Sequence, residues 1–204
     1  MARRNDHSRD QIRSMALEAA SHIIVKEGME GVSARKVAAK IGYTVGTLYH
    51  CFDNIQDLIL QANGATLSQL LTLLQSEKDS ATDPTVSLHK IAQGYLQFAE
   101  NHFNSWHALF QLKLPENTPT PDWYQTQIDT LFELLEQQLI LLNNSKSKRE
   151  IQLAARVLWG SVHGICSLYL DNKLFSDNIA PTEALIHSMV KNYLNSWCTA
   201  ENPN

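Results

Sequence analysis

The residues best suited to chemistry lie in one short segment, 33–52, which reads SARKVAAKIGYTVGTLYHCF. The segment predicts two short helices joined by a tight turn that contains Gly42, the shape that places a helix in the major groove of DNA. Glycine suits the left-handed conformation that ends the first of these helices. The expected underside of the pair is apolar and consists of Val37, Ile41, Leu48 and Phe52. The remaining side chains of the segment are expected to face outward.

These outward side chains carry the groups that DNA contacts require. Thr47 can hydrogen-bond a base edge, and its methyl group or Val45 can contact a thymine methyl. Gly46 allows close approach of the backbone, and the other polar side chains can contact phosphates. The predicted DNA-contacting residues are Arg4, on an arm ahead of the first helix, and Ser33, Arg35, Thr44, Val45, Gly46, Thr47, Tyr49 and His50. Spacing alone leaves open a purely structural helical hairpin.

The elements that position these residues are helices, because strand-like alternation is nearly absent from the chain. Ser8 and Gln11 form a candidate capping box for a helix that ends at Gly28. A longer helix follows Asn54, and the polar stretch 75–84 is predicted to be a loop. Further helical patterns cover about 85–112 with a break near 102–105, about 121–143, about 147–171 and about 181–198. The fold class is therefore all-α, with about nine helices.

Composition excludes several classes of protein. Hydrophobic residues make up 44% of the 204 residues, too many for an intrinsically disordered chain. The net charge of −4 argues against a polybasic nucleic-acid coat, but residues 1–54 hold eight Lys and Arg against six Asp and Glu. The rest of the chain holds nine against fifteen, so a basic head precedes an acidic body.

The N-terminal residues and the cysteines predict a cytoplasmic protein. The first residues lead into a charged segment with no apolar core, so no secretory signal is expected. The longest apolar run without charge, between Arg156 and Asp171, has 14 residues, fewer than a membrane span needs. Cys51, Cys166 and Cys198 are odd in number and widely spaced, which favours free thiols. A redox role for Cys51 finds no resolving cysteine nearby.

The run Val45–Phe52, followed by Asp57 and Leu58, resembles the recognition-helix signature of the tetracycline-repressor (TetR) family. Residues 32–38, 41–42 and 19–28 resemble the preceding helices of that family. The resemblance implies a helix-turn-helix DNA-binding domain over 6–60, an effector-binding and dimerisation domain over 61–204, and a homodimer. Family members often carry His where this chain has Cys51 and Lys where it has Ile55. The resemblance then implies two fewer phosphate contacts and a shallower salt dependence of DNA binding.

The acidic body contains a concentration of aromatic residues. Eight of the sixteen aromatics fall within the 38 residues 95–132. They predict an apolar pocket for a small organic effector, although aromatics at helical spacing are also typical of an ordinary core. The predicted ligand-binding residues are Tyr95, Phe98, Trp106, Phe110, Trp123, Phe132, Trp159 and His163.

Trp159, His163 and Gly164 resemble the Trp-His-Gly pattern of one TetR subgroup. The resemblance implies that the last two long helices form the dimer, and Gly160 and Gly164 lie on one side of their helix, where they permit close approach. His163 is also open to interpretation as a core residue, a hydrogen-bonding group of the pocket or a metal ligand.

No catalytic motif was found: the chain lacks a phosphate-binding glycine loop, a GxSxG elbow and an HExxH sequence. We therefore expect no enzyme, no cofactor and no metal. The favoured interpretation is a ligand-responsive repressor that binds a palindromic DNA operator as a homodimer and is released by a small, largely apolar effector. The alternatives are an all-α small-molecule-binding protein or enzyme, in which the helix-turn-helix is a structural hairpin, and a protein-interaction dimer.

Overall fold

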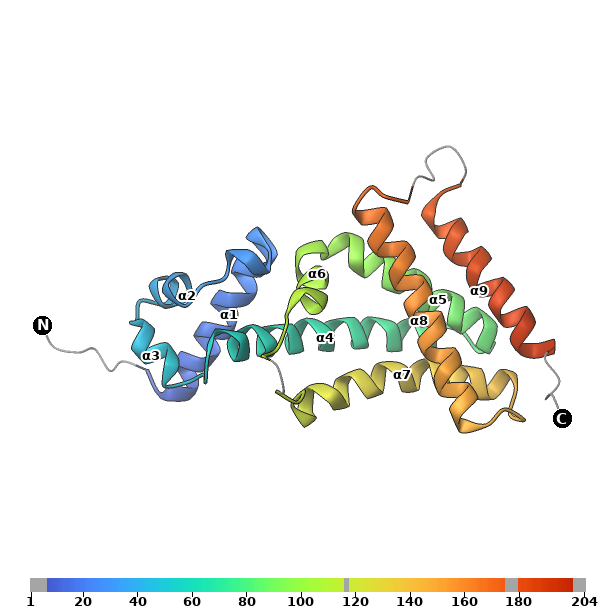
Figure 1. The fold of residues 1–204 in the computed structure, drawn as a ribbon, viewed down its shortest axis with the longest axis horizontal. Helices are drawn as coiled ribbons and strands as arrows, with labels where there is room; N and C mark the ends of the chain where they lie inside the picture. The colour runs from blue at the N-terminus through green and yellow to red at the C-terminus, as the bar shows by residue number, and fades with distance from the viewer. Residues whose placement is uncertain (1–6, 116–117, 175–179, 200–204) are drawn as a thin grey trace, which may run out of the picture. The chain divides into compact units, whose positions relative to one another are not determined.

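The structure is a computed structural model that describes residues 7–115, 118–174 and 180–199. Within these ranges the chain forms nine α-helices and one short 3₁₀ turn, which confirms the all-α prediction (Figure 1). The helices are α1 (Arg9–Glu27), α2 (Ala34–Ile41), α3 (Val45–Tyr49), α4 (Ile55–Asp79), α5 (Pro84–Asn101), α6 (Phe103–Gln111), α7 (Asp122–Leu142), α8 (Lys148–Leu170) and α9 (Thr182–Thr199), and the 3₁₀ turn η1 is Met29–Gly31.

The chain divides into two compact units. The first unit comprises Met1–Ser68 and His102–Pro121, and the second comprises Gln69–Asn101 and Asp122–Asn204. The first unit therefore holds α1, α2, α3, the beginning of α4 and α6. Helix α6 belongs to the same compact unit as the helix-turn-helix. The predicted boundary between the DNA-binding and effector-binding domains, at residues 60 and 61, stays a prediction.

The first unit, hereafter the headpiece, folds around α1. The capping box at its start is present: the Ser8 hydroxyl accepts from the Gln11 backbone N–H and the Gln11 side chain accepts from the Ser8 backbone N–H. Helix α1 packs against α2, α3 and α6. The buried core is small and apolar, and its members are Ile12, Ala16, Ala19, Ala20, Ile23, Ile24, Val37, Leu48, Cys51, Phe52, Leu58, Ala62 and Ala108.

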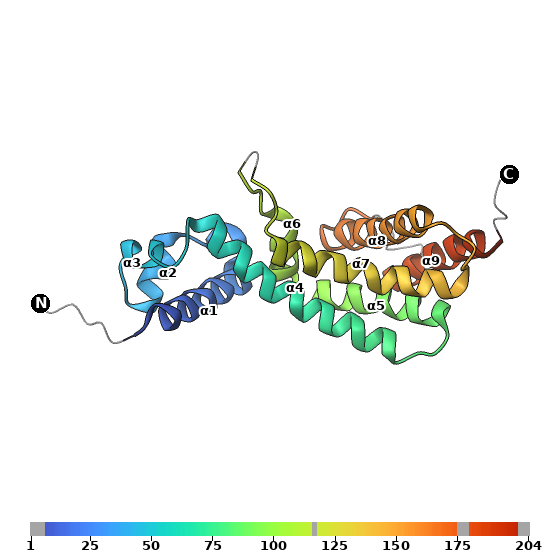
Figure 2. The same ribbon diagram turned by 90° about the horizontal axis from the view of Figure 1, so that it is seen from below.

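The second unit, hereafter the body, packs α5 against α7, α8 and α9, with α8 also in contact with α7 and α9 (Figure 2). Helix α8 begins with its own capping box, formed by Ser147 and Glu150. The C-terminal part of α4 lies very close to α5. A Cβ atom built on Gly94 would stand 2.9 Å from the Cγ atom of Glu77, so a side chain at position 94 would force Glu77 to move.

Two local predictions were wrong. The stretch 75–84 was expected to be a loop, but α4 continues to Asp79. The Gln75 side chain donates to the Asp79 carboxylate at 2.8 Å, one turn away, and such pairs stabilise a helix end. The helix that carries Leu48 was expected to include Phe52, yet α3 ends at Tyr49. Phe52 is nevertheless buried, because the turn that follows α3 returns it to the core.

Helix α8 is unusually apolar for its environment. Among the described residues it is the one helix with the length and composition of a membrane span, with a mean hydropathy of 1.2 over its most apolar stretch. Core helices of water-soluble proteins pass the same test when they are mostly buried, but only 28% of this stretch is buried within the chain. Packing within one chain therefore does not account for the apolar character of α8.

Candidate nucleic-acid interface and effector pocket

The turn between α2 and α3 is built by backbone geometry and caps. Helix α2 begins at Ser33, whose hydroxyl accepts from the Lys36 backbone N–H at 3.3 Å. It ends at Gly42, which has φ 76° and ψ 24°, the left-handed conformation that disfavours a side chain. The Tyr43 N–H donates to the Ala38 carbonyl at 2.9 Å and closes the helix end. The glycine predicted from the sequence therefore occupies the position that requires it.

Helix α3 is short, and two threonines organise its start. The Thr44 hydroxyl accepts from the Thr47 backbone N–H at 3.1 Å, and the two hydroxyl oxygens lie 2.9 Å apart. Leu48 is fully buried and fixes the inner side of the helix. Because one side is anchored by Leu48, the side that carries Gly46 and Tyr49 is presented outward.

Arg13 of α1 holds the end of α3, and sequence reasoning missed it. Its guanidinium donates to the Cys51 carbonyl at 2.9 Å and lies over the Phe52 ring, 5.1 Å from the ring centre. Both contacts fix the turn after α3 to α1. Nothing in the helical periodicity distinguishes Arg13 from Arg9, so no sequence signal identified it.

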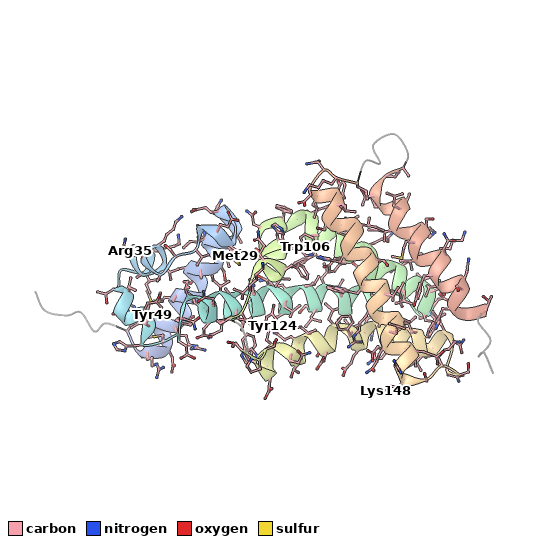
Figure 3. All side chains as sticks on the ribbon, viewed as in Figure 1. Met29, Arg35, Tyr49, Trp106, Tyr124 and Lys148 are labelled. Carbon is pink, nitrogen blue, oxygen red and sulfur yellow. The ribbon has the colours of Figure 1, made fainter. Side chains whose placement is uncertain are left out.

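Apart from Arg4, the predicted DNA-contacting residues lie on a single structural element, the helix-turn-helix. Figure 3 shows Arg35 on α2 and Tyr49 on α3, and Tyr49 is 45% exposed. Each of the predicted residues on this element keeps some surface open to solvent. Two are half-buried, Val45 and Thr47, and the others are exposed, namely Ser33, Arg35, Thr44, Gly46, Tyr49 and His50. Arg4 lies outside the described residues. Exposed polar groups and backbone of this kind suit contacts to phosphates and base edges, and the contacts themselves stay a prediction.

The two positions where this chain departs from the TetR pattern both face the core. Cys51 is buried, and its Sγ atom lies 3.7 Å from the Arg9 carbonyl oxygen. Ile55, the first residue of α4, packs against the headpiece core. Neither side chain offers a cation to a phosphate. The predicted loss of two phosphate contacts stays a prediction.

A cavity lies within the body. Its empty volume is about 480 Å³ when counted out to its mouth, of which about 30 Å³ is wide enough for the centre of a water molecule. The lining comes from α4, α5, α7, α8 and α9 and consists of Leu74, Leu88, Ile91, Ala92, Tyr95, Leu131, Leu134, Leu135, Leu158, Trp159, Val162 and Val190. The cavity is thus apolar and narrow.

A polar group stands beside this apolar cavity. The Tyr95 hydroxyl lies 2.9 Å from Nδ1 of His163, and Tyr95 is buried. The His163 ring stacks on Trp159, with ring centres 5.3 Å apart and planes inclined by 16°. Phe132 contacts Trp159 edge to face at 5.7 Å. Tyr95 and Trp159 line the cavity, and His163 and Phe132 contact these two residues without being part of the lining. The four residues come from three helices.

The other predicted ligand-binding residues lie elsewhere. Phe98 is buried in the body but is not part of the cavity lining. Trp123 is 44% exposed on α7. Trp106, labelled in Figure 3, and Phe110 lie on α6, which belongs to the headpiece unit. Their assignment to an effector site stays a prediction.

Two asparagines cap helix ends within the headpiece unit. The buried Asn63 of α4 donates through Nδ2 to the Ala108 carbonyl at 2.8 Å, and Asn104 of α6 donates to the Val25 carbonyl at 2.9 Å. Both carbonyls belong to the last turn of a helix, where the backbone leaves acceptors unpaired. These bonds hold α6 between α1 and α4. Sequence reasoning missed both, since a helical asparagine gives no sign of a distant carbonyl.

The electrostatics of the body are dominated by burial and by Glu100. Burial, followed by the nearby Glu100 carboxylate, raises the pKa of Cys166 to about 12, so this thiol stays protonated. A hydrogen bond to Glu100 raises the pKa of Tyr169. Across the described ranges no group of three His, Cys, Asp or Glu residues is placed to hold a metal ion.

Comparisons with known proteins agree with this architecture. Residues 16–62 match the family model described as "Bacterial regulatory proteins, tetR family", and residues 88–193 match "Tetracyclin repressor-like, C-terminal domain". No curated protein sequence gives a significant match. The Trp-His-Gly subgroup stays a prediction.

Solved structures share the fold over nearly the whole chain. A protein of unknown function from Rhodococcus sp. RHA1 matches with a TM-score of 0.74 and 16% identity, covering 96% of this chain and 98% of its own. The transcriptional regulator FadR from Bacillus subtilis, in complex with stearoyl-CoA, matches with a TM-score of 0.66 and 15% identity, covering 91% and 97%. The TetR-family regulator PfmR from Thermus thermophilus matches at 0.58 and 17%, covering 88% and 97%. At such identities these likenesses show the fold.

Proposed function

The chain belongs to the TetR family of DNA-binding transcriptional regulators, and we propose that it is a repressor. In this proposal a homodimer binds a palindromic operator in the cytoplasm, and a small, largely apolar effector releases it. Family membership decides against the enzyme alternative, because the family consists of regulators rather than enzymes.

The observation that carries the DNA-binding site is the geometry of the helix-turn-helix. A left-handed Gly42 and the Thr44 cap set the turn, Leu48 anchors α3, and Arg13 holds its end. The exposed residues on the opposite side can then enter a major groove while Ser33 and Arg35 contact phosphates. Because the headpiece carries only a small positive charge, we expect specific binding to require two headpieces on successive grooves, about 34 Å apart.

The support for a homodimer is the uncovered face of α8. Leu153, Val157 and Leu168 are 63%, 41% and 46% exposed, and they share one side of the helix with Gly160 and Gly164. A Cβ atom at either glycine would meet nothing within 4 Å, so the surface there is open. An apolar face of this kind marks an interaction site. We infer that α8 and α9 of a second copy cover it, which also gives the paired headpieces that a palindrome needs.

The support for an effector is the cavity in the body. It is lined by apolar side chains with one polar group at its side, as ligand pockets commonly are. The Bacillus subtilis FadR structure, which has the same fold, is in complex with stearoyl-CoA, a ligand that includes a long apolar acyl chain. The cavity holds only about two water molecules, which is too little space for an organic effector. The effector therefore has to bind a conformation of the body in which the helices lie further apart.

Release then follows from the effector's preference between two states. The chain passes between the units three times, within α4, between α5 and α6, and between α6 and α7. Residues of α4, α5 and α7 line the cavity. A widened body displaces these helices and with them the headpieces. The decrease in operator affinity is limited by the difference between the effector's affinities for the widened and the unwidened conformation of the body.

The experiment is a mobility-shift titration on the DNA upstream of the chain's own gene, combined with sedimentation equilibrium. Removing the hydroxyls of the recognition helix in the double variant Thr47→Val, Tyr49→Phe is expected to weaken operator binding by about 10- to 100-fold. The variant should remain a dimer, because neither residue lies on α8 or α9. The matched control is Thr130→Val on the exposed side of α7, which should bind like the wild type. No shift by the wild type at low salt, or equal affinity of the double variant, would contradict the proposed site.

A further inference from the structure

The lining of the body cavity restricts the charge of its ligand. Tyr95 and Trp159 are the lining residues with a polar side-chain atom, and all the others are Leu, Ile, Val or Ala. None of the residues that line the cavity is charged. A charged group inside would lose its hydration without gaining a counter-ion, which is strongly unfavourable. The enclosed part of a ligand is therefore uncharged.

The side chains around the Tyr95 hydroxyl define a polar corner, made of Tyr95, His163 and Trp159. Stacking on Trp159 fixes the plane of the imidazole ring whose Nδ1 lies 2.9 Å from the hydroxyl. A phenolic hydroxyl both donates and accepts, and a neutral imidazole nitrogen does one or the other according to its tautomer. A ligand hydroxyl also does both, so it suits either tautomer, whereas a carbonyl or ether oxygen only accepts.

Two charges on α5 lie equally far from Tyr95 along the helix axis, five residues or about 7.5 Å to either side: Lys90 and Glu100. The Lys90 ammonium donates to the carbonyl and hydroxyl of Ser80, whereas Glu100 faces α8. Its carboxylate contributes to the raised pKa values of Cys166 and Tyr169 on the facing helix α8. The same negative field disfavours a ligand carboxylate or phosphate at the polar corner.

The nearest arginine on the facing helix does not supply a compensating charge. Arg156 lies over the Phe132 ring at 4.4 Å and forms an ion pair with Glu136 at 3.2 Å. Its charge is thus already matched by a carboxylate. Arg156 is also absent from the lining of the cavity.

The dimensions of the cavity favour a slender ligand. The lining on α5 extends from Leu88 to Tyr95, about 10 Å along the helix axis. Only about 30 Å³ of the space can hold the centre of a water molecule. A wider ligand therefore requires the helices that line the cavity to move further apart. A straight chain widens the cavity less than a ring system of equal mass.

On the premise that the body binds an effector, we propose that this effector is an uncharged, slender apolar molecule with one hydroxyl group, recognised by Tyr95 and His163. A straight-chain alcohol has this chemistry. Its chain lies along the leucines of α5, α7 and α8, and its hydroxyl joins the polar corner.

The test compares three probes of equal chain length, 1-octanol, octanoate and 1-chlorooctane, by calorimetric titration of the full chain at about pH 7.5, where octanoate is ionised. The wild type should bind 1-octanol about tenfold more tightly than octanoate. Tyr95→Phe should weaken 1-octanol by about five- to tenfold and leave 1-chlorooctane unchanged, because only the alcohol uses the hydroxyl. Tyr124→Phe is the matched control: it removes the hydroxyl of a buried tyrosine outside the cavity lining and should change none of the three.

Each alternative result has a definite meaning. Equal binding of 1-octanol and octanoate, or an unchanged 1-octanol affinity in Tyr95→Phe, overturns the ligand class but leaves the effector pocket standing. Failure of all three probes to bind overturns the class as well. The DNA-binding function is decided separately by the operator titration, so the two failures are distinguishable.

Discussion

The headpiece and the body both consist of α-helices, but they differ in how completely they bury their apolar side chains. In the headpiece, apolar side chains point into one small core, and Ser8, Ser33 and Thr44 each cap a helix with a side-chain oxygen. In the body, a narrow cavity remains inside and an apolar stripe on α8 remains outside. The described part of the headpiece buries its apolar core within one chain, whereas the body leaves the cavity and the α8 stripe, on which the proposed effector and dimer rest.

This difference separates two sources of specificity. The turn of the helix-turn-helix is set by local features, namely caps, a left-handed glycine and a short connection, and Arg13 fixes its end to α1. In the proposed function, an effector in the cavity and a second copy on α8 both act on the body, and the headpiece responds to the body through the connecting chain.

The largest effect is expected on the uncovered face of α8. Val157→Glu places a charge in the proposed dimer interface, where it would be buried without a partner. We expect dissociation of the dimer to become at least about 100-fold easier, with loss of operator binding. Sedimentation equilibrium measures the first and a mobility shift the second.

The matched control for this prediction is Val86→Glu. Val86 on α5 is 45% exposed, close to the 41% of Val157, and lies on a different helix. The control should remain dimeric. If both variants dimerise like the wild type, α8 is covered by something other than a second copy, and the contrast between headpiece and body loses its main support.

A smaller effect is expected from the asparagine caps of the headpiece unit. Asn63→Ala removes a buried hydrogen bond to the Ala108 carbonyl and is expected to lower the free energy of unfolding by about 1–2 kcal/mol. Asn104→Ala removes a bond of the same type and nearly equal length, but a more exposed one, and should cost less than half as much. Denaturant unfolding of the two variants compares them directly. Equal costs would show that burial does not strengthen this connection between α4 and α6.

The smallest effect concerns the pH dependence of the body. His89 on α5 and His187 on α9 stack with ring centres 4.2 Å apart. Burial, followed by the charge of His187, lowers the pKa of His89. The fold therefore favours neutral His89, and its contribution to stability is complete above the unfolded pKa of about 6.5 and declines as the pH falls below it.

We expect this loss to stay below about 1 kcal/mol between pH 7.5 and 5.5, because His89 is only partly buried. His187→Gln should reduce the loss, since it removes the second positive charge. Thermal unfolding at the two pH values measures it, with His22→Gln in the headpiece unit as the control. An unchanged or steeper pH dependence in His187→Gln would show that the stacked pair does not control the acid response of the body.

The sequence by itself determined the helix-turn-helix almost completely. Gly42, the Thr44 cap and the apolar positions Val37 and Leu48 act within a few residues of one another, so their consequences can be derived from local geometry. The same locality explains why the all-α class and most helix boundaries were predicted. The error at 75–84 arose because a polar stretch was taken as a loop, although Gln75 and Asp79 support each other across a helical turn.

Only the tertiary structure decided which aromatic residues meet. Tyr95, Phe132, Trp159 and His163 form one contact cluster, of which Tyr95 and Trp159 line the cavity, because α5, α7 and α8 pack together. Trp106 falls in the headpiece unit with α6. The contacts of Arg13 and Asn63 also join residues 38 and 45 positions apart. Helical periodicity identifies the buried side of a helix but not the helix that covers it, because that choice depends on the packing of the whole chain.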